Sequence, residues 1–121
     1  MLILLVEDNE ANRVLMKDIL TLTGNKILEA GTGEEGVRLA QKHKPQLIFM
    51  DVELPGMDGI TATKILKQDA RTRDIPVVAV SSYYDEKEKR LFLANGGDYY
   101  LSKPIDVELV LATVRRFLPD I

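Results

Sequence analysis

The sequence predicts an α/β fold in which a doubly wound, five-stranded parallel sheet is flanked by five helices, all within one domain over residues 1–121. Five short apolar runs alternate with five segments of helical periodicity, and this alternation is typical of repeated strand–helix units. The apolar runs are continuous, as expected for strands that are buried on both faces. A chain of 121 residues also suits a single domain.

The expected strands are the apolar runs at residues 2–6, 27–29, 47–50, 77–80 and 99–101. The first expected helix follows over residues 10–22, and one of its faces carries Val14, Leu15, Ile19 and Leu22. The second begins at residues 32–35, which form a capping box, and continues through Val37, Leu39 and Ala40.

The remaining three helices alternate with the later strands. The third covers residues 59–69 and should turn its apolar side chains inward, namely Ile60, Ala62, Ile65 and Leu66. The fourth covers residues 85–95 and ends at Gly96-Gly97, a C-terminal signal. The fifth covers residues 106–118 and ends before Pro119. Its expected buried residues are Val107, Val110, Leu111, Val114 and Leu118.

Composition excludes several classes of function. The net charge of −3 argues against direct nucleic-acid binding, which needs a concentrated basic surface. The absence of cysteine excludes disulfides, thiolate zinc sites and cysteine nucleophiles. The apolar N-terminal run has no preceding basic segment and is too short for a signal peptide or a membrane span. We therefore expect a cytoplasmic protein that binds neither nucleic acid nor membrane.

Polar residues follow four of the expected strands at their C-terminal ends. They are Glu7 and Asp8, Asp51, Ser81, and Lys103. Parallel strands end at the same edge of a sheet, so these side chains should lie close together, at the edge where open α/β folds bind ligands. Two like charges about 4 Å apart cost about 4 kcal/mol at an effective dielectric constant of about 20. Mg²⁺, a hard cation that prefers oxygen ligands, would relieve this repulsion.

This set of residues indicates a phosphoryl-accepting site. Asp51 is the expected nucleophile, Lys103 and Mg²⁺ would neutralise the transferring group, and the Ser81 hydroxyl would donate a hydrogen bond to it. Taken singly, each residue has an ordinary explanation: Glu7 and Asp8 as an acidic helix start, Asp51 as a turn residue, Ser81 as a loop hydroxyl. Their coincidence at four strand ends favours the site.

Four segments, residues 4–9, 48–59, 76–81 and 96–104, resemble the receiver domain of bacterial two-component response regulators, in sequence and in spacing. The resemblance runs from end to end of the chain and is strongest to stand-alone regulators of cell-cycle type and to the receivers of hybrid histidine kinases. It implies the flavodoxin-like receiver fold. It also leaves open whether these residues are a complete protein or a fragment of a hybrid kinase.

The resemblance implies a metal site for Mg²⁺, with Mn²⁺ as an alternative. Asp8 and Asp51 would bind the ion directly, the backbone carbonyl of Glu53 would be a further ligand, and Glu7 would act through water. At the sequence position two residues after Asp51, Glu53 lies where the family varies.

The resemblance also implies the parts of a switch. Asp51 would accept the phosphoryl group, Lys103 would contact it, and the Lys103–Pro104 peptide bond would be cis. Ser81 would move toward the phosphoryl group, and Tyr100 would then turn inward.

Some residues depart from the family pattern, and others are expected to contact partner proteins. Ser82 stands where the family commonly has alanine, and Glu53 and Tyr83 could both hinder an attacking water. Tyr83 and Tyr84 are alternatively partner contacts. The expected partner surface comprises Lys87, Arg90, Leu91, Asn95, Tyr99 and Asp106.

The predicted function is a phospho-accepting signalling switch of a two-component system or phosphorelay, without an output domain. Its partners would be a sensor histidine kinase or histidine phosphotransferase and a downstream protein effector. It would be no enzyme beyond its own phosphotransfer and dephosphorylation, and a monomer, with a phosphorylation-dependent dimer as an alternative. Two other functions stay open: an aspartate-nucleophile phosphatase, disfavoured because Glu53 replaces that family's second aspartate, and an unphosphorylated docking module that binds Mg²⁺.

Overall fold

The computed structural model describes residues 1–82 and 84–119, which form the predicted parallel sheet and its helices. The strands are β1 Leu2–Val6, β2 Lys26–Ala30, β3 Leu47–Asp51, β4 Val77–Ser81 and β5 Tyr99–Ser102. The helices are α1 Glu10–Thr21, α2 Gly33–His43, α3 Gly59–Gln68, α4 Glu86–Ala94 and α5 Val107–Phe117. For every strand and helix whose first and last residues were both predicted, each of these two bounds lies within one residue of the prediction.

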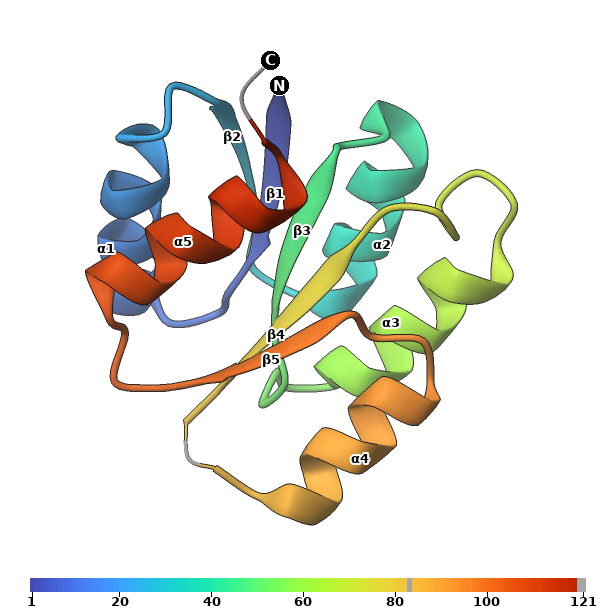
Figure 1. The fold of residues 1–121 in the computed structure, drawn as a ribbon. Helices are drawn as coiled ribbons and strands as arrows, with labels where there is room; N and C mark the ends of the chain where they lie inside the picture. Colours follow the sequence, from blue (N-terminus) through green and yellow to red (C-terminus); the bar gives the residue numbers. More distant parts are fainter. Residues whose placement is uncertain (83, 120–121) are drawn as a thin grey trace.

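The five strands are parallel and lie in the order β2-β1-β3-β4-β5. Helices α1 and α5 cover one face of the sheet, and α2, α3 and α4 cover the other (Figure 1). The chain passes from β1 to β2 on one side and then returns to β3 on the other side of β1. The strand order therefore reverses beside β1 and β3, and this is the place where ligands bind in such sheets.

The hydrophobic core has two parts, one on each face of the sheet. Alternate residues of each strand point to opposite faces, so Leu4 and Ile48 pack toward α2, α3 and α4, whereas Ile3, Leu5 and Phe49 pack toward α1 and α5. All five side chains are at most 2% exposed. The two-sided burial explains why the strands are continuously apolar in sequence.

The predicted inner face of α1 is largely wrong. Val14 is 51% exposed, Leu15 47% and Leu22 72%, whereas Met16 and Leu20 are buried in their place. Only Ile19 is buried as predicted. The helix carries two apolar stripes that share Ile19, and the sheet covers one of them.

The inner face of α5 needs one correction. Val107 is exposed, whereas Val110 and Val114 are buried and Leu111 and Leu118 pack partly buried against the same core. Val107 is the first residue of the helix, directly after the N-cap Asp106. On α2 and α3 the predicted side chains do face the core: Val37, Ala40, Ala62 and Leu66 are buried, and Leu39, Ile60 and Ile65 pack against them.

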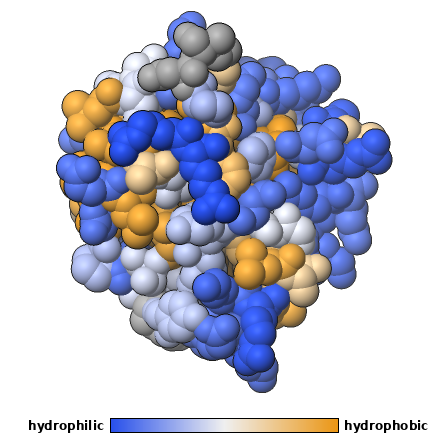
Figure 2. Space-filling model, viewed as in Figure 1, coloured by the Kyte–Doolittle hydropathy of each residue, from blue (hydrophilic) through white to orange (hydrophobic). Residues whose placement is uncertain are grey.

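Hydrophobic surface remains in separate areas over α1 and α5 and beside α4, with hydrophilic residues between them (Figure 2). Among the helices formed by residues 1–82 and 84–119, none combines the length and the hydropathy that crossing a bilayer requires.

Candidate functional site

Asp51 is the last residue of β3 and its side chain is buried, with 4% of the residue exposed. The backbone N–H of Glu53 donates a hydrogen bond to Asp51 Oδ1 at 3.0 Å and so fixes one carboxylate oxygen. The start of α3 packs directly on this backbone, because a Cβ atom at Gly59 would lie 2.1 Å from the carbonyl oxygen of Asp51. Asp51 is thus a buried carboxylate that is fixed at the end of the central strand of the sheet.

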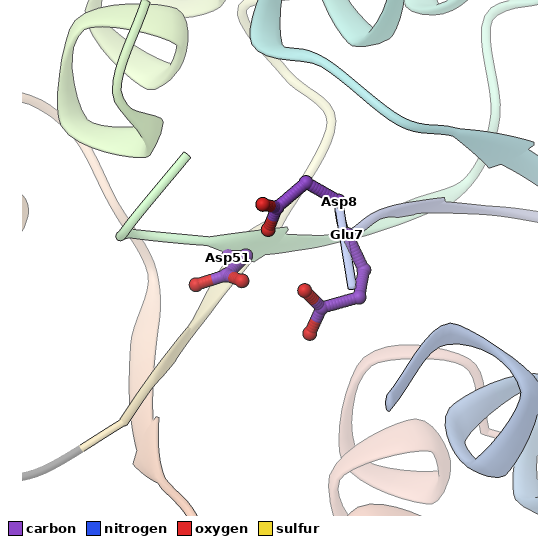
Figure 3. A group of neighbouring side chains, drawn as sticks. All are labelled: Glu7, Asp8 and Asp51. Carbon is purple, nitrogen blue, oxygen red and sulfur yellow. The ribbon is translucent and has the colours of Figure 1, made fainter. Parts of the chain in front are cut away.

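Two further acids follow β1, and Figure 3 shows their carboxylates beside that of Asp51. Glu7 is 3% exposed and Asp8 is exposed, and ligand oxygens of Glu7, Asp8 and Asp51 all lie within 4.8 Å of one another. The N–H of Asn9 donates to Glu7 Oε2 at 3.2 Å, and Arg13 Nη1 donates to the Glu7 carbonyl at 3.0 Å. These bonds orient the acidic group from the first turn of α1.

A lysine that follows the edge strand of the sheet completes this cluster. Lys103 follows β5, and its Nζ lies 3.0 Å from Glu7 Oε1 and 3.5 Å from Asp51 Oδ2. The backbone N–H of Lys103 donates to the carbonyl of Ser81, and the Lys103–Pro104 peptide bond is cis. The residues predicted from the ends of β1, β3 and β5 therefore do meet.

The electrostatics of the cluster follow from its burial. The pKa of Asp51 is raised to about 6, first by burial and then by the hydrogen bond and negative charge of Glu7, against the opposing effect of Lys103 and of the Glu53 N–H. Burial alone lowers the pKa of Lys103, but the two carboxylates outweigh it and hold the pKa above its ordinary value. Crowded acids and one buried cation are suited to bind an oxyanion together with a divalent cation.

Ser81 supplies a hydroxyl from the end of β4 and is fully buried. Its Oγ lies 3.1 Å from Glu53 Oε1 and 2.8 Å from Glu88 Oε1. The N–H of the next residue, Ser82, donates to Glu53 Oε1 at 2.7 Å. The side chain of Glu53 therefore reaches across from the β3 end to the donors at the β4 end.

The protein-family model of the response regulator receiver domain matches residues 3–115 of the chain. The chain belongs to the response regulator receiver domain family. Receiver domains are phospho-accepting signalling switches, and the chain is one of them.

Named relatives agree with this assignment. The polar-differentiation response regulator DivK of Brucella anthropi is 36% identical over 118 residues, which cover 98% of this chain and 96% of DivK. A crystal structure of the receiver domain of a Pseudomonas aeruginosa sensor histidine kinase, with magnesium coordinated in its active-site cleft, is 28% identical, with a TM-score of 0.90 and 98% of each chain covered. The chemotaxis protein CheY4 of Vibrio cholerae is 26% identical, with a TM-score of 0.90 over 97% of this chain and 98% of its own.

Tyr100 of the receiver domain lies on β5 and is buried, with 8% exposed. Its hydroxyl donates to Glu88 Oε1 at 2.6 Å. The pKa of Tyr100 is raised to about 12, first by burial and then by the hydrogen bond to Glu88, while the Ser81 hydroxyl acts in the opposite direction. The aromatic residue of the predicted switch thus already points inward in this structure.

Sequence reasoning missed Glu88, which contacts both predicted switch residues, Ser81 and Tyr100. The charged stretch over residues 85–90 is, by its pattern alone, as consistent with a solvated helix face as with a partner surface. One signal was available: Glu88 precedes Phe92 by four residues, and residues at this spacing share a helix face. Phe92 is fully buried, so Glu88 lies on the inner side of α4.

The predicted partner surface divides into two groups. Lys87, Arg90 and Leu91 on α4 are exposed. The other members have contacts within the fold. Asn95 caps α4 through its Nδ2, Asp106 caps α5, and the ring of Tyr99 lies under Arg116 at 4.9 Å.

Two tyrosines complete the predicted surroundings of the site. Tyr83 lies outside the described residues. Tyr84 is 56% exposed, and its ring meets that of Tyr100 edge-to-face with the centroids 6.2 Å apart.

Proposed function

We propose that this receiver domain accepts a phosphoryl group from a phosphohistidine of a partner kinase or phosphotransferase on Asp51. The observation that carries the proposal is the approach of Lys103 Nζ to both Asp51 and Glu7 at one sheet edge. A buried nucleophilic carboxylate beside a fixed cation can accept a phosphoryl group and hold the charge that it brings.

In the proposed reaction, an Asp51 carboxylate oxygen attacks phosphorus, and the phosphorus–nitrogen bond of the donor breaks. The electron pair of that bond returns to the imidazole nitrogen, which leaves an acyl phosphate on the receiver. With a pKa of about 6, Asp51 is mostly ionised at neutral pH and can act as the nucleophile. Lys103 stabilises the charge on the transferring oxygens, and Ser81 donates a hydrogen bond to one of them.

The acidic cluster fits Mg²⁺ because its three carboxylates supply hard oxygen donors within 4.8 Å of one another. Asp8, Asp51 and the Glu53 carbonyl would hold the ion, with Glu7 acting through water and Mn²⁺ as an alternative. When bound, the ion supplies neutralisation of the phosphoryl charge. The magnesium in the cleft of the Pseudomonas aeruginosa receiver supports this choice.

The proposed output is a change in protein–protein contact. Lys87, Arg90 and Leu91 on α4 present an exposed surface to a downstream effector, on the helix that also carries the contacts to Ser81 and Tyr100. Beyond its own phosphotransfer and dephosphorylation, the domain would turn over no substrate. Histidine kinases that use ATP would act on it in the cytoplasm.

The test is intact mass after incubation with acetyl phosphate and Mg²⁺. We expect one phosphoryl adduct that requires Mg²⁺ and is absent in Asp51→Asn. Asp74→Asn is the matched control, since Asp74 is exposed and precedes β4 at the opposite sheet edge. Absence of an adduct with both acetyl phosphate and a phosphohistidine donor would contradict the proposal, and turnover of many donor equivalents would indicate a phosphatase.

A further inference from the structure

A single carboxylate, that of Glu88 on α4, contacts both residues of the predicted switch. Glu88 Oε1 lies 2.8 Å from Ser81 Oγ and accepts a hydrogen bond from the Tyr100 hydroxyl at 2.6 Å. We propose that Glu88 competes with the phosphoryl group for the Ser81 hydroxyl and thereby opposes phosphorylation of the domain. This inference rests on the proposed function of Asp51 as phosphoryl acceptor.

The competition follows from the chemistry of a hydroxyl group, which has one hydrogen to donate. Ser81 is fully buried, so bulk water cannot replace a lost partner. In the structure that hydrogen faces two carboxylates, Glu88 at 2.8 Å and Glu53 at 3.1 Å. Hydrogen bonds to ionised acceptors are about twice as strong as neutral ones. Ser81 must therefore exchange one strong acceptor for another when it turns to a phosphoryl oxygen.

The same oxygen links Ser81 to the aromatic residue. Because Glu88 Oε1 bonds both hydroxyls, withdrawal of Ser81 leaves the carboxylate with Tyr100 as its remaining partner of the two. Tyr100 is also packed against Phe92, with ring centroids 6.3 Å apart. Glu88 is accordingly a positioning residue. It orients the hydroxyl and the ring without contacting the reacting carboxylate of Asp51.

Charge acts in the same direction as the hydrogen bond. A phosphoryl group adds about −1.5 to −2 charges at neutral pH. Glu53 and Glu88 both lie within 3.1 Å of Ser81 Oγ, so the hydroxyl that must reach the phosphoryl group already lies between two carboxylates. Removal of the Glu88 charge should thus favour the phosphorylated form on both counts.

The first experiment compares the rate of phosphorylation by acetyl phosphate and Mg²⁺ in Glu88→Ala, Glu88→Gln and the wild type. We expect an increase of about three- to tenfold for Glu88→Ala, and a smaller one for Glu88→Gln, whose amide oxygen still accepts a hydrogen bond. Glu86→Gln is the matched control: it removes the same charge from the same helix turn, but Glu86 contacts Tyr84 instead of Ser81. It should stay within about twofold of the wild type. An unchanged or lower rate for Glu88→Ala overturns the proposal.

The second experiment needs no phosphorylation. In protein labelled with ¹³C at the tyrosine Cζ atoms, the Tyr100 signal, assigned with Tyr100→Phe, reports ionisation of its hydroxyl. Glu88→Gln should lower the pKa of Tyr100, while Glu86→Gln should leave it unchanged. An unaltered Tyr100 titration in Glu88→Gln overturns the contact, and with it the proposal.

The two experiments together separate the two proposals. Lack of an adduct in every variant overturns the proposed function and the competition with it, whatever the tyrosine titration shows. A normal adduct in the wild type with no acceleration in Glu88→Ala overturns the competition alone.

Discussion

The ammonium of Lys103 donates a hydrogen bond to Glu7 Oε1 at 3.0 Å, although 96 positions separate the two residues. Lys103 follows β5 and Glu7 follows β1, and two strands, β3 and β4, lie between them in the sheet. The lysine side chain therefore reaches across the C-terminal edge of the sheet and neutralises acids at the ends of β1 and β3. Both residues are largely buried, with side chains 13% and 4% exposed.

Lys103→Met should destabilise the metal-free protein. It removes the cation between the buried carboxylates of Glu7 and Asp51 and leaves their charges uncompensated. We expect a loss of about 2 to 3 kcal/mol in the free energy of unfolding at pH 7, measured by urea denaturation in EDTA. Lys42→Met, at an exposed position on α2, should change stability by about 0.5 kcal/mol or less. An equal loss in both variants would argue against the ion pair.

Asp51 should make stability depend on pH in the absence of metal. Its pKa in the folded protein is about 6, above the ordinary value of 3.8, so the folded state binds the proton more tightly than the unfolded state does. Its stabilising effect is present below pH 3.8 and is lost as the pH rises through 6. Asp51→Asn should therefore be more stable than the wild type at pH 7.5, by about 1 to 3 kcal/mol, and the two should converge near pH 4. Urea denaturation in EDTA at both pH values tests this, and a constant difference between them would refute it.

Mg²⁺ should raise the melting temperature, because a ligand that binds only the folded state stabilises it. At an ion concentration about ten times the dissociation constant, the gain is about 1.4 kcal/mol. Asp8→Asn should reduce this gain, since Asp8 belongs to the group of three carboxylates within 4.8 Å of one another. Asp74→Asn should leave it intact. Equal Mg²⁺ effects in the two variants would place the ion elsewhere.

Gly59→Ala should disturb the site through the backbone. The new Cβ atom would lie 2.1 Å from the Asp51 carbonyl oxygen and 2.9 Å from Val52 Cα, and backbone atoms cannot move aside cheaply. We expect a loss of about 3 kcal/mol and weaker stabilisation by Mg²⁺, both measured by thermal denaturation. Gly31→Ala is the control, since its Cβ atom would meet nothing within 4 Å. A mild effect at Gly59 would show that α3 can shift away from β3.

Lys67→Met should destabilise the fold away from the site. The Lys67 ammonium donates to Asp98 Oδ2 at 3.0 Å, to the Ile75 carbonyl at 2.7 Å and to the Arg73 carbonyl at 3.3 Å. The substitution leaves these acceptors without that partner, which should cost about 2 kcal/mol in urea denaturation. Lys64→Met, one turn earlier on α3 and exposed, should be nearly neutral. Equal stability of the two variants would mean that water replaces the ammonium.

The sequence was a good guide to the strands and to the cluster at their ends. A strand buried on both faces must be continuously apolar, so residues 47–50 could be recognised as β3 without knowledge of its neighbours. Glu7, Asp51 and Lys103 followed from the same reasoning, because parallel strands end at a common edge.

Helix faces and long-range side-chain contacts could not be predicted as well. Val14 and Met16 are both apolar, and only the position of α1 over the sheet decides which one is buried. The contacts of Glu88 could not be predicted, because they depend on how closely α4 approaches β5. That approach is set by the packing of Phe92 and Tyr100, which the local pattern around Glu88 does not reveal.

The distribution of the site over the strand ends has a consequence for biosynthesis. Glu7 is translated 96 residues before its partner Lys103. Until then Asp51 lacks the ammonium that faces it in the folded domain. If Asp51 is the acceptor, as proposed, a nascent chain cannot become competent for phosphorylation before β5 has been made.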